Sequence, residues 1–410
     1  MDTLPAGSPA HLRTLNARAV LDSLGREDAL SRPDVAAATG LARSAVTQTL
    51  RALVTTGVVT EAGIDRERRG PAATRYRVDP DHGFGLGVDV ARDRVRVALV
   101  DVTGAVRARA ERRDVAATPV ARARAAAELG RGCVADVATR LGRETGIEVS
   151  RAVAAVPAIV GSDQETVRRV PGFEKGGTTL HDALVDALGC PVALENDLNL
   201  AALAEQRDGV AVGVPTFVAL GLGGGFGAGV VVDGKLHRGA AGGAGEVSFL
   251  PHPERPLGSE VLGAVSIRAI AKENGLPEDV TVRDVVDRAE RGDGAASDVL
   301  DLVAERIAVV TATIALVVEP ELFVLTDQAA RAPIADRVTR FLADRVAVLG
   351  LRVAPSTLGA DAVVVGAARA ASDALRDDVV RAAVAVDVAP ADGASGGETA
   401  DEPEAAEAVS

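Results

Sequence analysis

The chain has 410 residues, 47% of them hydrophobic and 25% charged, which is typical of a globular protein with two or three domains. A formal net charge of −13 excludes a protein that coats nucleic acid over its whole surface. Two cysteines, Cys133 and Cys190, are too few for a disulfide framework and are expected in the core. The beginning lacks an apolar signal stretch, and the most apolar run, Ile307–Val318, is too short to span a bilayer. We therefore expect a cytoplasmic protein without membrane contact.

Charge is unevenly distributed along the chain. Residues 1–80 hold eleven arginines, no lysine and nine acidic residues, so this segment is +2 and the remainder carries −13 minus +2, or −15. Such asymmetry is typical of a DNA-reading unit attached to an acidic body.

The first 80 residues show the pattern of a winged helix-turn-helix. Residues 11–26 have helical apolar spacing, Ser31-Arg-Pro begins a short helix that stops at Gly40, and a second helix runs from Leu41 to Val54. Two short strands, Val58–Thr60 and Arg75–Val78, then flank a loop rich in glycine and arginine. This pattern predicts an all-α unit with a small β wing.

Candidate DNA contacts lie on the second helix and in the wing. The second helix of such a motif enters the major groove, where side chains read base edges, while wing arginines suit phosphates or a narrow minor groove. The predicted contacts are Arg43, Ser44, Thr47 and Gln48 to bases, Arg51 to a phosphate, and Arg66, Arg68 and Arg69 from the wing. The alternative is a three-helix module for protein contacts, with the arginines as a solvated face.

From Phe84 the pattern is that of an α/β body in two similar halves. Each half opens with strands and continues with helices. The expected strands are Gly85–Val90, Val95–Val102, Val106–Ala110, Arg151–Val156, Thr216–Leu222, Gly227–Val232, Leu322–Leu325 and Ala362–Val365. Helices are expected over Pro119–Thr145 and through Ser259–Val318. The predicted domains are thus 1–80, 81–388, and an acidic tail, 389–410, expected to be disordered.

Three motifs in the body carry polar chemistry. Glu195-Asn196-Asp197 follows a strand, a glycine-rich turn spans Gly221–Gly229, and Ala241-Gly-Gly-Ala-Gly-Glu246 follows a second turn. Carboxylate and amide side chains at a strand end suit neighbouring sugar hydroxyls. Alternatively, the glycines form a tight hairpin that needs positive φ, and Asn196-Asp197 begins a helix; the helix start is compatible with sugar binding.

Together these motifs resemble the ROK family of repressors and sugar kinases over about residues 84–385, and the first unit resembles the winged unit of the family's repressors. The resemblance implies a two-lobed actin/hexokinase-like (ribonuclease H-like) sugar-kinase fold. It also implies that Asn196, Asp197, Glu246 and Glu260 bind a sugar effector, with Asp197 at the position of the kinases' base. The turn containing Gly223, Gly224, Gly225 and Gly227 resembles the second phosphate loop. A double-stranded DNA operator and a homodimer, or a dimer of dimers, are implied as partners.

Departures from the kinases predict lost chemistry. The first phosphate loop reads Asp89-Val-Ala-Arg-Asp93 without glycine, the late Gly-Gly is replaced by Thr326-Asp327, and Phe249 replaces a zinc-binding His. We therefore expect no catalytic residue, no metal or other cofactor, and a regulator, expected to be a repressor, that senses a sugar without phosphorylating it. One alternative is an active ATP-dependent sugar kinase with a DNA-binding head. Another is a regulator that answers a non-sugar ligand or a protein.

Overall fold

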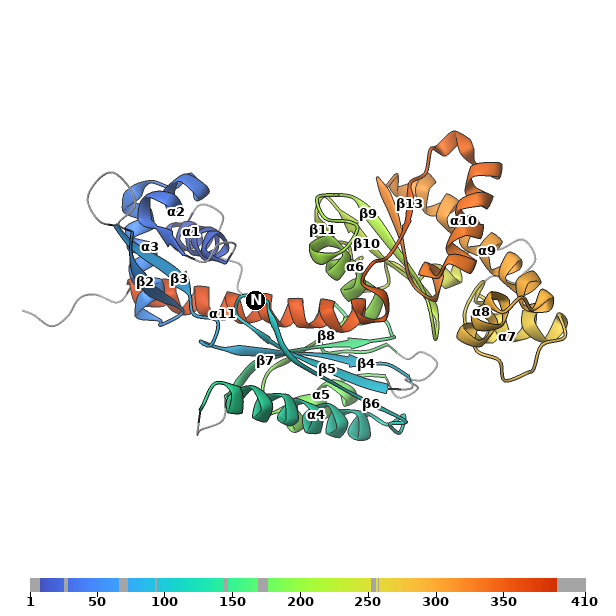
Figure 1. Cartoon of the computed structure of the whole chain (residues 1–410), viewed down its shortest axis with the longest axis horizontal. Coiled ribbons are helices and arrows are strands. Elements are labelled where there is room, and N and C mark those ends of the chain that lie inside the picture. Colours follow the sequence, from blue (N-terminus) through green and yellow to red (C-terminus); the bar gives the residue numbers. More distant parts are fainter. Residues whose placement is uncertain are drawn as a thin grey trace, which may run out of the picture. The chain divides into compact units, whose positions relative to one another are not determined.

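The computed structural model describes residues 8–25, 29–65, 73–92, 94–143, 147–168, 176–251, 256 and 258–388 (Figure 1). It divides into two compact units, residues 1–78 with 378–410, and residues 79–377. The sequence assigned residues 378–388 to the larger domain, whereas in the structure they group with the first unit. The tail 389–410 lies outside the described residues.

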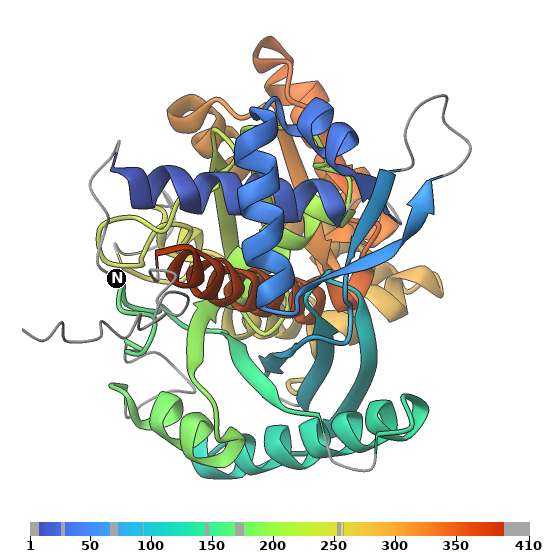
Figure 2. The same ribbon diagram turned by 90° about the vertical axis from the view of Figure 1, so that its left-hand side faces the viewer.

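The first unit, called the head here, is a three-helix bundle with a small antiparallel sheet. Its elements are α1 (Pro9–Leu24), β1 (Leu30–Ser31), α2 (Arg32–Thr39), α3 (Arg43–Thr55), β2 (Val59–Asp65) and β3 (Ala73–Val78), with sheet order β1-β3-β2. The Ser31 side chain and Asp34 form a capping box that begins α2, and Gly40 ends α2 in the left-handed conformation with φ 70°. The end of α11 (Ala362–Val388) packs in this unit, with Val380 and Ala383 buried (Figure 2).

The second unit, called the body here, contains two lobes with matching sheets. The first sheet has the order β6-β5-β4-β7-β8 and the second β11-β10-β9-β12-β13, each with three antiparallel strands followed by two parallel ones. The first sheet is built from β4 (Phe84–Val90), β5 (Arg94–Asp101), β6 (Val106–Arg113), β7 (Val149–Val156) and β8 (Val192–Asn196). The second is built from β9 (Phe217–Leu222), β10 (Phe226–Val232), β11 (Lys235–Leu236), β12 (Leu322–Asp327) and β13 (Val353–Pro355). The expected two similar halves and the actin/hexokinase-like fold are confirmed.

Helices cover both faces of the first sheet. On one face, α4 (Pro119–Arg140) and α5 (Thr179–Leu188) bury a core that includes Cys133 and Cys190, as expected (Figures 1 and 2). On the other face, α6 (Asp197–Asp208) and the first half of α11 pack through small side chains such as Ala367 and Ala371. The second lobe adds α7 (Ala264–Glu273), α8 (Val282–Glu290), α9 (Gly294–Val318) and α10 (Ala332–Arg345), which share one core with β9, β10 and β12.

One predicted strand is wrong. Ala362–Val365 is the first turn of α11, because the apolar run Ala-Val-Val-Val continues into an alanine-rich helix with buried Val364, Ala367, Ala368 and Ala371 on one face. The strand that pairs beside β12 is instead β13, which the sequence analysis did not predict. The long helix expected over Pro119–Thr145 ends earlier, at Arg140, and Gly142 adopts φ 63° just after it.

Candidate functional site

The head presents part of α3 to solvent. Val46, Leu50 and Leu53 are buried, while Arg43, Ser44, Gln48 and Arg51 are exposed. Thr47 is half-buried, and its hydroxyl donates to the main-chain oxygen of Arg43 at 2.9 Å. The predicted wing contacts Arg66, Arg68 and Arg69 lie outside the described residues. The α3 candidates therefore share an exposed face, and their contact with DNA stays a prediction.

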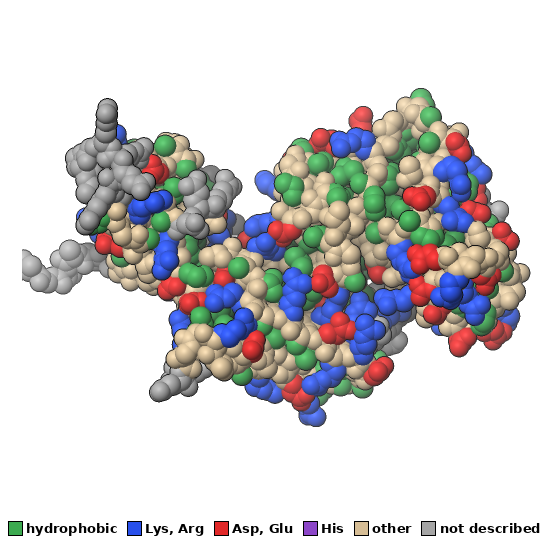
Figure 3. All heavy atoms as spheres, viewed as in Figure 1, with side chains coloured by type: hydrophobic (Ala, Val, Ile, Leu, Met, Phe, Trp, Pro, Cys, Tyr) green, Lys and Arg blue, Asp and Glu red, His purple; other side chains and the backbone are tan. Residues whose placement is uncertain are grey.

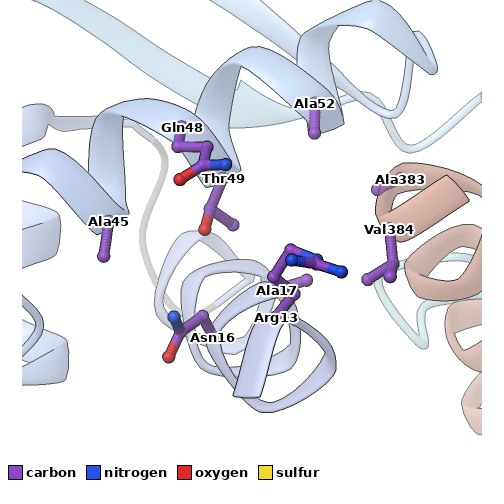
Figure 4. A pocket seen from close by; sticks show the side chains of 9 residues that line it. All are labelled: Arg13, Asn16, Ala17, Ala45, Gln48, Thr49, Ala52, Ala383 and Val384. Carbon is purple, nitrogen blue, oxygen red and sulfur yellow. The ribbon is translucent and has the colours of Figure 1, made fainter. Parts of the chain in front are cut away.

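A second part of α3 faces the end of α11. A pocket in the head is lined by Arg13 and Asn16 of α1, by Gln48 and Thr49 of α3, and by Val384 of α11 (Figure 4). Gln48 is exposed and lines the same pocket as Val384 in the last turns of α11. Sequence reasoning missed this pocket, because no local pattern connects residue 48 with residue 384.

Asn196 and Asp197 stand where β8 ends and α6 begins. The Asn196 side-chain oxygen accepts the backbone N–H groups of Leu198 at 2.9 Å and Asn199 at 3.2 Å, so Asn196 is the N-cap of α6. Its side-chain amide donates to the main-chain oxygen of Ala158 at 3.2 Å. This bond connects the start of α6 to the segment after β7. The alternative that Asn196-Asp197 begins a helix is correct, and these residues also lie at the end of strand β8.

Three carboxyl groups act on Asp197. The pKa of the half-buried Asp197 is raised to about 7. Burial is the largest cause, the charge of Asp89 comes next, and the charges of Glu246 and Asp327 add smaller effects. The hydrogen bond from the Leu198 N–H acts in the opposite direction and lowers the pKa. Burial and the charge of Glu260 raise the pKa of Glu246 above its ordinary value. Asp197, Glu246 and Glu260 thus lie in one region of the body. We call these three residues, together with Asn196, Asp89 and Asp327, the interlobe site.

The loop that carries Glu246 approaches the first lobe closely. Gly245 accepts the N–H of Ala228 at 2.8 Å, which fixes the loop on β10. Gly242 has φ 78°, and a methyl group there would lie 1.8 Å from the main-chain oxygen of Val160. Only glycine fits this approach. Phe249, which was predicted to replace the kinases' His, follows in a short turn and is 44% exposed.

The glycine-rich turn is the tip of the β9–β10 hairpin. Leu222 pairs with Phe226 across it, and the N–H of Gly223 donates to the oxygen of Gly225 at 2.8 Å. None of the glycines between 221 and 229 has φ in the left-handed region, so the alternative of a hairpin that needs positive φ is wrong. These glycines instead allow close approach, because a methyl group at Gly221 would lie 2.3 Å from Leu198 Cδ1 of α6.

The segments predicted to depart from the kinases' nucleotide motifs contain charged groups. Asp89 is buried and accepts two bonds from Arg96, at 2.6 and 2.9 Å, and Arg96 also donates to the oxygen of Ala360 at 2.6 Å. A methyl group at Gly223 would lie 2.2 Å from Asp327 Oδ2, so this carboxylate lies against the glycine tip. Asp93 lies outside the described residues.

Two ion pairs around the site were missed in the sequence. The Asp89–Arg96 pair is cross-strand in the β4–β5 register, so writing out the hairpin would have revealed it. Buried Glu195 accepts from Arg238 Nε at 2.5 Å and from the Asn199 side chain at 2.8 Å, which links the Glu246 loop to the base of α6. That contact has no local signal in the sequence.

Within the described residues, no cluster of three or more His, Cys, Asp or Glu side chains is arranged to hold a metal ion. Nor does any described helix have the length and apolarity needed to cross a membrane.

The sequence is similar to known protein families and to individual proteins. The ROK family profile matches residues 85–374, and the profile described as the IclR helix-turn-helix domain matches residues 15–63. A xylose repressor of Caldicellulosiruptor bescii is 23% identical over 355 residues, covering 79% of this chain and 85% of that protein. A glucokinase of Halalkalibacterium halodurans is 30% identical over 216 residues, covering 46% of this chain and 65% of that protein.

Solved structures share the fold. A ROK family transcriptional regulator described as a homologue of the E. coli MLC protein superposes with a TM-score of 0.73 at 22% identity, covering 91% of this chain and 99% of that one. A Streptomyces griseus ROK glucokinase, crystallised with glucose and AMPPNP, gives a TM-score of 0.59 at 23% identity, covering 71% of this chain and all of that one. Because the family profile spans most of the body and a helix-turn-helix profile matches the head, the chain belongs to the ROK family and carries an N-terminal helix-turn-helix unit.

Proposed function

We propose that this chain is a DNA-binding transcription regulator, a repressor, whose body binds a sugar or sugar derivative without phosphorylating it. The observation that carries the proposal is the joining of a helix-turn-helix head, with Arg43, Ser44 and Arg51 exposed on α3, to a ROK body in one chain. Relatives that include a protein named xylose repressor, similar over 79% of this chain, support it.

DNA reading is tested by selecting duplexes from a random library and measuring their binding by fluorescence anisotropy. Arg43→Ala should lose about 1–3 kcal/mol and relax base preference, because Arg43 lies in the first turn of α3. Arg51→Ala should lower the affinity for all DNA sequences alike. It should also reduce the salt dependence of that affinity by the amount expected for about one phosphate contact. If both variants lost the same affinity for every DNA sequence, Arg43 would not contact bases. If the wild-type protein selected no sequence, the proposal itself would fail.

Sugar sensing is tested at Glu246, whose charge acts on Asp197. A ligand shifts DNA binding only if it binds the two states with different affinity. Glu246→Gln should bind DNA normally and lose the response to an effector that releases the wild-type protein. Glu273→Gln, an exposed change on α7, is the control and should keep the response. An unchanged response of the Glu246 variant would place the sensing site elsewhere.

A second function, an ATP-dependent sugar kinase, is favoured by one observation. Asp197, whose pKa burial raises to about 7, is suited to accept a proton near neutral pH. The carboxylate of Asp327 against the glycine tip opposes this function, because phosphoryl transfer needs its phosphates held and neutralised. Sugar-dependent ADP release at about 1 per second or faster would establish the kinase. Its absence over a sugar panel supports the sensor.

We further propose a homodimer, or a dimer of dimers, because a symmetric regulator reads paired half-sites. These should be centred about 34–36 Å apart, or a multiple of that. Light scattering of the purified chain measures the mass, and the spacing of half-sites in selected duplexes tests the symmetry. A monomer bound to single half-sites would contradict this.

A further inference from the structure

The loop that leads to Glu246 has no large side chain of its own to hold it in place. Its sequence, Gly239-Ala-Ala-Gly-Gly-Ala-Gly245, consists of glycine and alanine alone. Glycine loses more conformational freedom on folding than any other residue, so such a segment is costly to order. The loop is closed at its base, because the N–H of Ala244 donates to the main-chain oxygen of Arg238 at 3.1 Å. Whatever fixes Arg238 therefore also fixes the loop.

The side chain of Arg238 is held by the other lobe of the body. Arg238 follows β11 in the second lobe, and its Nε donates to Glu195 Oε2 of β8 in the first lobe at 2.5 Å. The arginine side chain is 43% exposed, whereas the glutamate side chain is only 5% exposed. A buried carboxylate without a partner is strongly destabilising, so the pair resists opening.

This pair differs from the ordinary surface pairs of the protein. On the face of the body seen in Figure 3, Lys and Arg side chains lie next to Asp and Glu side chains at many places. Exposed pairs of that kind contribute little, because water and salt screen them. An example is Arg207 with Asp373, whose side chains are 51% and 47% exposed. The burial of Glu195 makes its pair with Arg238 a firmer connection between the lobes.

The same carboxylate also fixes the half of the interlobe site that lies in the first lobe. Glu195 Oε1 accepts the N–H of Asn196 at 2.9 Å and the side-chain amide of Asn199 at 2.8 Å. Asn196 caps α6, and Asp197 is the first residue of that helix. One oxygen of Glu195 thus orients the start of α6, and the other orients the loop that leads to Glu246.

We propose that Glu195 and Arg238 are positioning residues, which hold the start of α6 and the Glu246 loop in place for a sugar. The inference deepens the proposed function and rests on the body binding a sugar at Asn196, Asp197 and Glu246. A site that is ordered before the ligand arrives binds more tightly, because the ligand does not have to order it. Ordering the backbone of one residue corresponds to a factor of about 5–30 in affinity.

The first test is hydrogen exchange of the full chain without any sugar, followed in peptides that cover residues 239–250. Arg238→Met keeps much of the apolar stem and removes the donor, and it should fold because the arginine is partly exposed. The amide of Ala244 should then exchange about fivefold faster or more. Arg238→Lys keeps a positive donor and should lie between Arg238→Met and the wild type. Arg207→Met is the matched control, since it removes the exposed pair with Asp373 near the other end of α6, and it should leave the loop unchanged.

The second test is isothermal titration calorimetry of the same variants, without DNA, against neutral pentoses and hexoses that include D-xylose and D-glucose. The probe is the sugar that the wild-type chain binds most tightly. Arg238→Met should bind it about fivefold more weakly or worse, Arg238→Lys should recover part of the loss, and Arg207→Met should bind it normally. Glu195→Gln, which keeps the size of the side chain and removes its charge, should act in the same direction as Arg238→Met.

Each part of the inference has a result that would overturn it. Unchanged exchange in Arg238→Met would show that the pair does not hold the loop. Faster exchange with unchanged sugar affinity would show that the loop does not position the site. An equal loss of affinity in Arg207→Met, or no recovery in Arg238→Lys, would show that the loss is not specific to this pair. If no sugar binds the wild-type chain, the proposed sugar sensor fails and takes the inference with it. Sugar binding that tolerates Arg238→Met sinks the inference alone and leaves the proposed function intact.

Discussion

Asn196 performs two structural tasks that substitution can separate. Its side-chain oxygen caps α6 through the N–H groups of Leu198 and Asn199, and its amide donates to Ala158. Asn196→Ala removes both. The lost cap costs about 1 kcal/mol and the lost bond to Ala158 about another 1 kcal/mol, about 2 kcal/mol together. Asn196→Ser keeps a good N-cap and loses only the bond to Ala158, so it should cost about 1 kcal/mol.

Thermal unfolding followed by circular dichroism distinguishes the two variants. For a domain of this size each kcal/mol lowers the midpoint by about 2–4 °C, so we expect falls of about 4–8 °C for Asn196→Ala and about 2–4 °C for Asn196→Ser. Equal midpoints for both variants would refute the cap contribution. A wild-type midpoint for Asn196→Ser would refute the contribution of the bond to Ala158.

Three further changes test the interlobe site. Because the folded pKa of Asp197 is about 7 and its unfolded value about 3.8, folding disfavours the anion and stability is lost as pH rises from about 4 to 7. Asp197→Asn should therefore gain stability over wild type at pH 8 and not at pH 4, as measured by urea unfolding. Gly242→Ala should distort the Glu246 loop and weaken effector binding, whereas Gly243→Ala, with nothing within 4 Å of the added methyl group, should not. Arg96→Met should cost about 3–5 kcal/mol by leaving a buried carboxylate unpaired, and Asp89→Asn combined with it should recover most of that in the same unfolding assay.

The elements of the head and the body could be predicted where local chemistry determines them. Ser31 and Gly40 begin and end α2, and the strand patterns around residues 84–110 fold as β4, β5 and β6. The run Ala362–Val365 was predicted as a strand, because four apolar residues fit either structure and only the alanine-rich continuation decides for a helix.

The chemistry of the site was only partly predictable. Asn196 and Glu246 were predicted from their motifs, and their binding of a sugar stays a prediction. The pair of Arg238 with buried Glu195 joins residues 43 positions apart, and no periodicity in the sequence reports such a contact.

The head cannot be completed until α11 has been synthesised. The head is synthesised first, yet the packing of its α1 and α3 includes Ala383 and Val384. Between residue 78 and residue 388 the ribosome adds 310 residues, which takes about 15–60 s at about 5–20 residues per second. A nascent or truncated chain therefore carries a head that lacks its last packing partner. A chain broken anywhere in the body cannot supply that partner to its head.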